Sequence, residues 1–145
     1  MSWPKPQPGL VIRYAYLWAR EAEQGREEGV KDRPCAIVLT LLRDDGHPIV
    51  RVLPVTHTPP ADPADALEIP APTKQRLGLD HERSWVILTE SNDFIWPGPD
   101  LRPLTNGDPA TIAYGMLPPA FFTVLRERLI ARWRTGPSGA VKRTE

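Results

Sequence analysis

The chain has 145 residues, which is enough for a single domain with a substantial core. Hydrophobic residues make up 41% and charged residues 25%, an ordinary balance that excludes wholesale disorder. The 18 basic and 18 acidic side chains cancel, which excludes a general attraction to nucleic acid or membrane, so any polyanion site has to be local.

Proline and cysteine usage narrows the class further. The 18 prolines favour short strands and ordered loops over long helices, which predicts a mainly β or α+β fold. Cys35 is the only cysteine, so we expect a reducing compartment and no disulfide framework. No apolar run is long enough to span a bilayer, and the N-terminal MSWPKPQPG lacks the apolar stretch of a signal peptide. A cytoplasmic protein is expected.

The N-terminal part is predicted to form a strand and then a polar loop. Residues 9–18 are rich in β-branched and aromatic side chains, and alternation places Tyr14 and Tyr16 on one face. Residues 19–32 are polar and contain an acidic stretch, 20–28. Their composition could form a short helix, but Gly25 and Gly29 weaken it, so a mobile loop is the preferred prediction.

Two apolar runs, residues 35–42 and 48–56, are joined by an Asp-Asp-Gly turn and predict a β-hairpin. The first run is apolar on both alternating sets, which is typical of a central strand covered on each face. Because a hairpin brings its outer ends together, Arg33 and Thr56 are expected at one edge of the sheet.

The second half alternates short elements with loops, among them a proline-rich excursion at residues 59–72. The elements expected here are a short strand at 66–69, a helical turn at 73–79, strands at 84–90 and 94–96, and an amphipathic helix at 118–134. We therefore divide the chain into a proline-rich arm (1–8), one domain (9–134) and a flexible tail (135–145).

A set of polar residues gathers at the predicted edge of the hairpin: Lys31, Arg33, Thr56, His57 and Thr58. A guanidinium matches phosphate oxygens, a threonine hydroxyl donates a hydrogen bond, and an imidazole ordinarily titrates near neutral pH. These are the parts needed to cleave a phosphodiester without a metal. Trp96 adds a ring on which a base can stack.

A structural interpretation of the same residues stays open on the sequence alone. In it, Arg33 pairs with Asp32 or with a loop glutamate, and the threonine hydroxyls bond backbone groups in a turn. Trp85 and Trp96 are then core residues.

Metal and nucleophile chemistry has little support in the sequence. The histidines at 47, 57 and 81 and Cys35 show no ligand spacing, so no metal and no cofactor are expected. Cys35 sits inside an apolar strand and is interpreted as a small core residue.

The order of features resembles the PemK/MazF family of toxins from type II toxin–antitoxin systems. The pieces that carry the resemblance are Gly9-Leu-Val-Ile, Lys31-Asp-Arg33-Pro34, Val52-Leu-Pro54-Val-Thr56, Leu77-Gly78-Leu79 before Ser84-Trp-Val, and Gly115-Met-Leu-Pro before the closing helix. They extend over about residues 9–134, and their spacing carries more weight than any one motif.

The resemblance implies a small SH3-like antiparallel β-barrel of the PemK/MazF/CcdB type with a C-terminal helix, usually a homodimer bound by a cognate antitoxin. It also implies metal-independent cleavage of single-stranded RNA, in which the 2′-hydroxyl attacks the neighbouring phosphate. Family active-site residues map onto Arg33 and Thr56. We add His57 as a candidate acid or base, and Lys31, Thr58 and Trp96 as candidate RNA contacts.

Several features depart from that pattern, namely the proline-rich segment 59–72, the FIWPGPDL segment and the acidic loop 20–28. An alternative is therefore a catalytically inactive barrel that binds a protein or a nucleic acid. By the same resemblance, a third expectation is an inhibitor of a protein target such as DNA gyrase, acting through Trp133 and Arg134.

Overall fold

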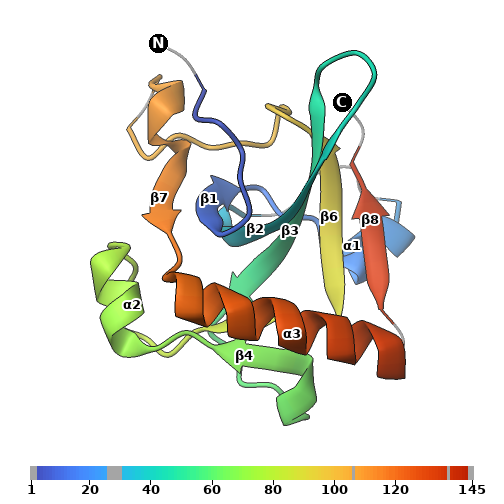
Figure 1. Ribbon diagram of the computed structural model, residues 1–145, viewed down its shortest axis with the longest axis vertical. Coiled ribbons are helices and arrows are strands. Elements are labelled where there is room, and N and C mark those ends of the chain that lie inside the picture. Colours follow the sequence, from blue (N-terminus) through green and yellow to red (C-terminus); the bar gives the residue numbers. More distant parts are fainter. Residues whose placement is uncertain (1–2, 26–30, 106, 137, 144–145) are drawn as a thin grey trace.

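A computed structural model describes residues 3–25, 31–105, 107–136 and 138–143. In this part of the chain, eight strands form one sheet in which all pairings but one are antiparallel (Figure 1). The path of paired strands runs β4-β5-β3-β2-β1-β7, with β6 on β3 and β8 on β6. Among the described residues no pairing joins the two ends of this path, so closure of the sheet into a barrel is not observed. The fold is a mostly β, α+β domain.

The central hairpin consists of β2 (Arg33–Leu42) and β3 (Pro48–Thr56), as predicted. Gly46 turns the chain between them with φ of 84°, a conformation that suits a residue without Cβ. On its other edge β3 pairs first with β6 (Glu90–Ile95) and then with β5 (Trp85–Ile87). The strand predicted over 84–90 is thus divided between two elements that pair with different halves of β3.

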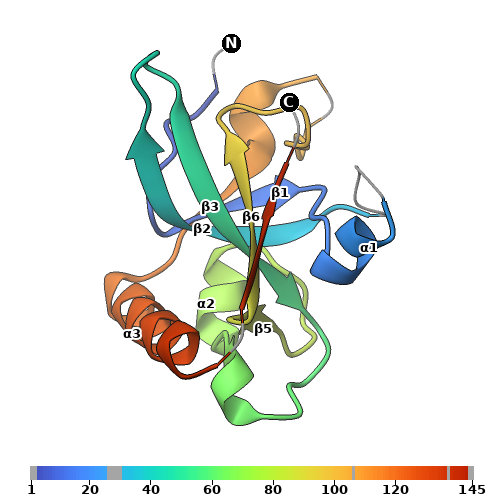
Figure 2. The same ribbon diagram turned by 90° about the vertical axis from the view of Figure 1, so that its right-hand side faces the viewer.

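The remaining elements are short except for one helix. The shorter ones are β1 (Leu10–Tyr14), α1 (Ala19–Glu23), η1 (Pro63–Asp65), β4 (Ala66–Glu68), α2 (Ala71–Arg76), η2 (Pro109–Ile112), β7 (Ala113–Met116) and β8 (Gly139–Lys142). The long helix is α3 (Pro119–Thr135), within one residue of its predicted bounds at each end. It lies across one face of the molecule near α2 and β4 (Figures 1 and 2).

The two faces of the sheet carry separate cores. One core gathers the aromatic side chains predicted to share a face, including Tyr14 and Tyr16, with Phe94 stacked on Tyr14 at 4.6 Å between ring centroids. The other core lies under α3 and contains the fully buried Leu53, Val86, Leu88 and Leu125. Two-sided burial of the sheet explains the uninterrupted apolar runs of its central strands.

The prediction that residues 35–42 are covered on both faces is wrong for the outer half of β2. Cys35 to Ile37 are buried, but Leu39, Leu41 and Leu42 are 39%, 53% and 83% exposed. The reason is that β1 pairs with β2 only as far as Ala36, so the hairpin extends beyond the covered part of the sheet.

Two segments expected to be irregular contain regular structure. Residues 19–23 form α1, whose start is tied down because the Trp18 N–H donates to the Glu21 carboxylate and the Ala19 N–H to the Glu90 carboxylate. Residues 26–28 of the acidic loop lie outside the described residues. The flexible-tail prediction is wrong for 139–142, which form β8 parallel to β6.

Candidate site at the open end of the central hairpin

The hairpin register brings the predicted site residues to one edge of the sheet. Cys35 lies opposite Pro54, which places Arg33 level with Thr56 two residues further out. Both side chains line a hollow of about 220 Å³, together with Lys31 and His57. The expected juxtaposition of these four residues is therefore confirmed, and Thr58 lies in the adjoining hollow.

Of the two ion pairs that the structural interpretation allows for Arg33, the one with Asp32 is absent, and the loop glutamates 27 and 28 lie outside the described residues. Asp32 instead lies near Arg13 and Arg102, at 3.6 and 3.5 Å, and no described carboxylate pairs with Arg33. The Arg33 guanidinium donates to the Val55 carbonyl at a long 3.4 Å and sits 4.8 Å from the centre of the Trp18 ring. Its Nε is buried without a hydrogen-bond partner among the described residues. Such orphaned donors are rare in native proteins, and Ser91, Arg132 and Arg143 each have one as well.

The Thr56 hydroxyl can close a turn and also bind a ligand. Its hydroxyl oxygen accepts a hydrogen bond from the Thr58 N–H at 3.2 Å, the turn that the structural interpretation predicted. That contact uses an oxygen lone pair and leaves the hydroxyl proton free to donate. Thr56 can therefore close the turn and still bind an oxygen of a ligand in the hollow.

His57 lies between two carboxylates that the sequence reasoning did not place in the site. Its Nε2 is 2.7 Å from Asp80 and its Nδ1 is 3.4 Å from Glu82. The cause is strand pairing: Thr56 at the end of β3 lies opposite Trp85 at the start of β5. Residues just after β3 therefore meet residues just before β5. The polar Asp-His-Glu run ahead of the Ser84-Trp85 strand was the available signal.

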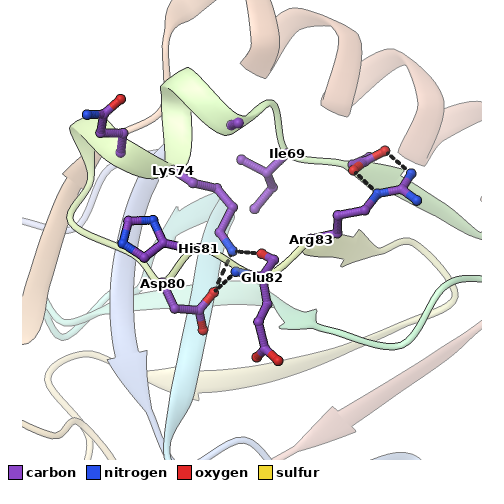
Figure 3. A pocket seen from close by; sticks show the side chains of 9 residues that line it. Ile69, Lys74, Asp80, His81, Glu82 and Arg83 are labelled. Carbon is purple, nitrogen blue, oxygen red and sulfur yellow. Dashed lines mark hydrogen bonds and ion pairs between the residues drawn. The ribbon is translucent and has the colours of Figure 1, made fainter.

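The buried Lys74 side chain holds the Asp80 carboxylate in place through a hydrogen bond. It is 4% exposed, and its ammonium donates to Asp80 at 2.6 Å, to the Ser84 hydroxyl at 2.6 Å and to the Glu82 carbonyl. Figure 3 shows its side chain reaching from α2 toward the Asp80–Glu82 loop. All three ammonium protons are thus used within the protein. Lys74 holds the site together and has no proton left for a ligand.

The Lys74–Asp80 pair also sets the electrostatics of the site. The hydrogen bond from Lys74, followed by the one from His57, lowers the pKa of Asp80 from its ordinary value. Asp80 is therefore a carboxylate at neutral pH, and it fixes the orientation of the His57 ring.

A further hollow of about 250 Å³ lies on the other side of Lys74 and Asp80 (Figure 3). Its rim includes Arg83, which forms two hydrogen bonds of 2.8 Å to the Glu68 carboxylate. Those bonds lower the pKa of Glu68. Because Lys74 and Asp80 line both hollows, the two lie next to each other along the same edge.

One group of side chains in the described part of the chain could supply metal ligands. A nitrogen of His57 and carboxylate oxygens of Asp80 and Glu82 lie within 4.8 Å of one another. All three residues are exposed, and the Lys74 ammonium already neutralises Asp80. The geometry therefore favours a hydrogen-bonded histidine over a metal centre.

Two other sequence predictions are resolved by burial. Trp96 is 5% exposed and packs in the aromatic core 6.1 Å from Phe94, so the prediction of an RNA contact there is wrong. Trp85 is also buried. Cys35 is fully buried, and burial raises the pKa of its thiol, which confirms its interpretation as a core residue.

Comparison of the chain with protein-family models, with curated proteins and with solved structures finds no match. In the described part of the chain, no helix combines the length and the apolar character that crossing a membrane requires.

Proposed function

We propose that the chain is an endoribonuclease that cleaves single-stranded RNA without a metal ion, at the hollow lined by Arg33, Thr56 and His57. The observation that carries the proposal is the hairpin register, which gathers a guanidinium, a hydroxyl and an imidazole around one solvent-accessible hollow. Cleavage of a phosphodiester is assisted by a cationic donor, a neutral donor and a group that moves a proton. Arg33, Thr56 and His57 supply these three groups in that order.

The proposed reaction is attack of a ribose 2′-hydroxyl on the adjacent phosphorus. The bond from the 2′-oxygen to phosphorus forms, the bond to the 5′-oxygen breaks, and a 2′,3′-cyclic phosphate and a 5′-hydroxyl result. Arg33 stabilises the negative charge that grows on the phosphorane, because a guanidinium keeps its protons at any working pH. The Thr56 hydroxyl donates to a second phosphate oxygen.

His57 takes the proton from the 2′-hydroxyl in this scheme. If its Nε2–H donates to Asp80 at 2.7 Å, the neutral ring carries its lone pair on Nδ1. In that tautomer Nδ1 and the Glu82 oxygen, 3.4 Å apart, are both acceptors and do not hydrogen-bond to each other, and Glu82 is the more exposed carboxylate, so the substrate hydroxyl can take its place. Asp80 is then the orienting group, and water protonates the departing 5′-oxygen.

The wider assignment to a PemK/MazF-like toxin, with an SH3-like barrel, a homodimeric state and an antitoxin partner, is part of the same proposal. The order of elements supports it: a first strand, the short helix α1, the Arg33-Pro34 strand, the strand ending at Thr56 and a long helix near the C-terminus.

Purified protein incubated with single-stranded RNA in excess EDTA tests the proposal. Fragments with 2′,3′-cyclic phosphate ends are expected, and they should disappear with Thr56→Val and fall with His57→Ala. An unchanged pH–rate profile in His57→Ala would remove the acid–base role of that residue. Complete stability of several RNAs against the wild-type protein would reject the nuclease.

A second candidate function rests on a different observation. Leu39, Leu41 and Leu42 are exposed on the outer half of β2, where β1 no longer pairs with that strand. An exposed apolar strand edge is suited to pairing with another chain. A non-catalytic binding module would capture a partner through this edge, lose it with Leu41→Lys, and leave RNA intact.

A further inference from the structure

A third hollow, of about 300 Å³, adjoins the proposed cleavage site on the side away from Lys74. Its walls include the Trp18 ring, two successive prolines and an isoleucine, and its rim carries threonine hydroxyls. The residues used below are Trp18, Thr58, Pro59, Pro60, Ile87 and Thr89. The described residues that line the other two hollows include no tryptophan, tyrosine or phenylalanine.

Two contacts connect this hollow to the cleavage site. Thr56 lines both of them. Arg33, which lines the cleavage site, places its guanidinium 4.8 Å from the centre of the Trp18 ring. A ligand that packs against Trp18 therefore lies directly beside Arg33 and Thr56, the groups proposed to hold the phosphate.

The three hollows follow one another along the edge of the sheet. The Trp18 hollow and the Arg33 hollow share Thr56. The Arg33 hollow and the Arg83 hollow share Lys74 and Asp80. A row of linked hollows fits an extended polymer better than a single small molecule. In a single-stranded RNA, a base next to the phosphate at Arg33 would fall beside Trp18 or beside the Arg83 hollow.

We infer that the hollow lined by Trp18, Pro60 and Thr89 binds the nucleobase of a nucleotide adjoining the phosphodiester held at Arg33 and Thr56. The inference rests on the proposed function for the position of that phosphodiester. It adds a base-binding subsite, which would give the enzyme its sequence preference at one position.

The chemistry of the lining selects a base over other groups. An aromatic ring and flat proline faces offer the stacking surface that unpaired bases use, and base–aromatic stacking is a principal source of affinity for single strands. Arg20, whose guanidinium is 5.9 Å from the Trp18 ring, is exposed at the mouth and can stack on the outer face of the base.

The rim supplies groups that can recognise the edge of a base. The hydroxyls of Thr58 and Thr89 make no hydrogen bond to another described residue, so they can donate or accept. Asp65 accepts from Arg132 at 2.7 Å through one carboxylate oxygen, and its second oxygen is an additional acceptor. This mixture favours a base edge that presents N–H groups.

Filling the hollow without removing a packed side chain is the first part of the test. Ala61 lines the hollow and is exposed, so Ala61→Phe introduces bulk there with little risk to folding. Ala64 is exposed in η1 and lines none of the three hollows, so Ala64→Phe is the matched control.

Binding is measured by fluorescence anisotropy with short 2′-O-methyl RNA, which the 2′-hydroxyl reaction cannot cleave. An abasic ribose is placed at each position of the oligonucleotide in turn. Ala61→Phe is expected to weaken binding of the intact oligonucleotide about 5- to 100-fold. At one position the abasic substitution should cost the wild type a similar factor and cost Ala61→Phe almost nothing further, whereas Ala64→Phe behaves as wild type.

The inference would be overturned if, at every abasic position, the loss of affinity from Ala61→Phe and the loss from the missing base multiplied independently. In that case no base of the oligonucleotide would contact the hollow. Trp18→Phe gives a second route, since it keeps a stacking ring and should lose less than Trp18→Ala. Equal losses for both Trp18 variants, at equal thermal stability, would also count against the subsite. Absence of cleavage of ordinary RNA, with coupled binding retained, would reject the nuclease and leave the subsite standing.

Discussion

Two partly or fully buried arginines, Arg143 and Arg33, have opposite environments. The Arg143 side chain is 1% exposed and contacts Asp100 at 2.8 Å, the Ala15 carbonyl at 2.8 Å and Asn92 at 3.1 Å. Arg33 has no carboxylate partner among the described residues, one long hydrogen bond to the Val55 carbonyl and a place over the Trp18 ring. Both side chains are costly to bury, and among the described residues only the charge of Arg143 is compensated by a carboxylate.

The difference separates a side chain that holds the fold together from one that is ready for a ligand. Arg143 joins the end of β8 to the segment after β1 and to β6, three parts of the chain far apart in sequence. Arg33 lies at the end of one strand and borders an open hollow. We therefore expect stability to depend on Arg143 and RNA cleavage to depend on Arg33.

The largest expected effect on stability is that of Arg143→Met. The substitution removes the guanidinium that contacts the Asp100 carboxylate, 9% exposed, at 2.8 Å. Breaking a buried pair in this way costs about 3–5 kcal/mol. Urea denaturation should show this loss, while Lys142→Met, exposed on the same strand, should change stability by less than about 0.5 kcal/mol. Equal stabilities would mean that β8 does not dock.

Lys74→Met tests whether a buried charge inside the site is structural. Removing the ammonium leaves Ser84, 2% exposed, and the Glu82 carbonyl without their donor, at a cost of about 1.5–3 kcal/mol. Because Asp80 and thereby His57 lose their anchor, kcat/KM should fall about tenfold as well. Arg76→Met, exposed on the same helix, is the control. Loss of activity at unchanged stability would place Lys74 with Arg33, as a ligand-binding group.

Acid titration gives a smaller effect at the same place. Hydrogen bonds from Lys74 and His57 lower the pKa of Asp80 below its ordinary 3.8, so its contribution to stability is present above that pH. It is lost as the pH falls through the lowered value. Since Asp80 is half exposed, Asp80→Asn should cost less than about 1 kcal/mol at neutral pH. The gap between variant and wild type should close in acid, and a gap that widens there would contradict the assignment.

Glu90→Gln should have the smallest effect and tests a buried carboxylate close to Trp18. Burial raises the pKa of Glu90, so its ionised form is disfavoured in the folded protein as the pH rises above the ordinary 4.5. Glutamine keeps the oxygen that accepts from Tyr16 and from the Ala19 N–H. At neutral pH the variant should be as stable as wild type or more stable by up to about 1 kcal/mol. A clear loss at neutral pH would show that the charge itself strengthens those hydrogen bonds.

The hairpin and its edge could be predicted because both depend on local signals. Alternating apolar residues and the Asp-Asp-Gly turn determine the pairing of β2 with β3, and that pairing alone places Arg33 level with Thr56. The helix α3 was predictable for the same reason, since its apolar spacing is contained within the segment.

The missed features all depend on contacts between distant segments. Asp80 and Glu82 reach His57 only because β5 pairs with the end of β3. The short GAVK segment of β8 has no strong pattern of its own and is ordered by parallel pairing with β6 and by Arg143. Trp96 offered no sequence signal that distinguishes a core ring from a stacking platform.

The most direct test of the account is Arg33→Ala, with RNA cleavage in EDTA and the free energy of unfolding measured on the same preparation. We predict a loss of cleavage of about 10²–10³-fold, as for removal of one transition-state donor, with stability within about 1 kcal/mol of wild type. Arg43→Ala, at the exposed tip of the hairpin, should match wild type in both. Cleavage at the wild-type rate by Arg33→Ala, or a stability loss as large as that of Arg143→Met, would contradict the assignment of Arg33 to the active site.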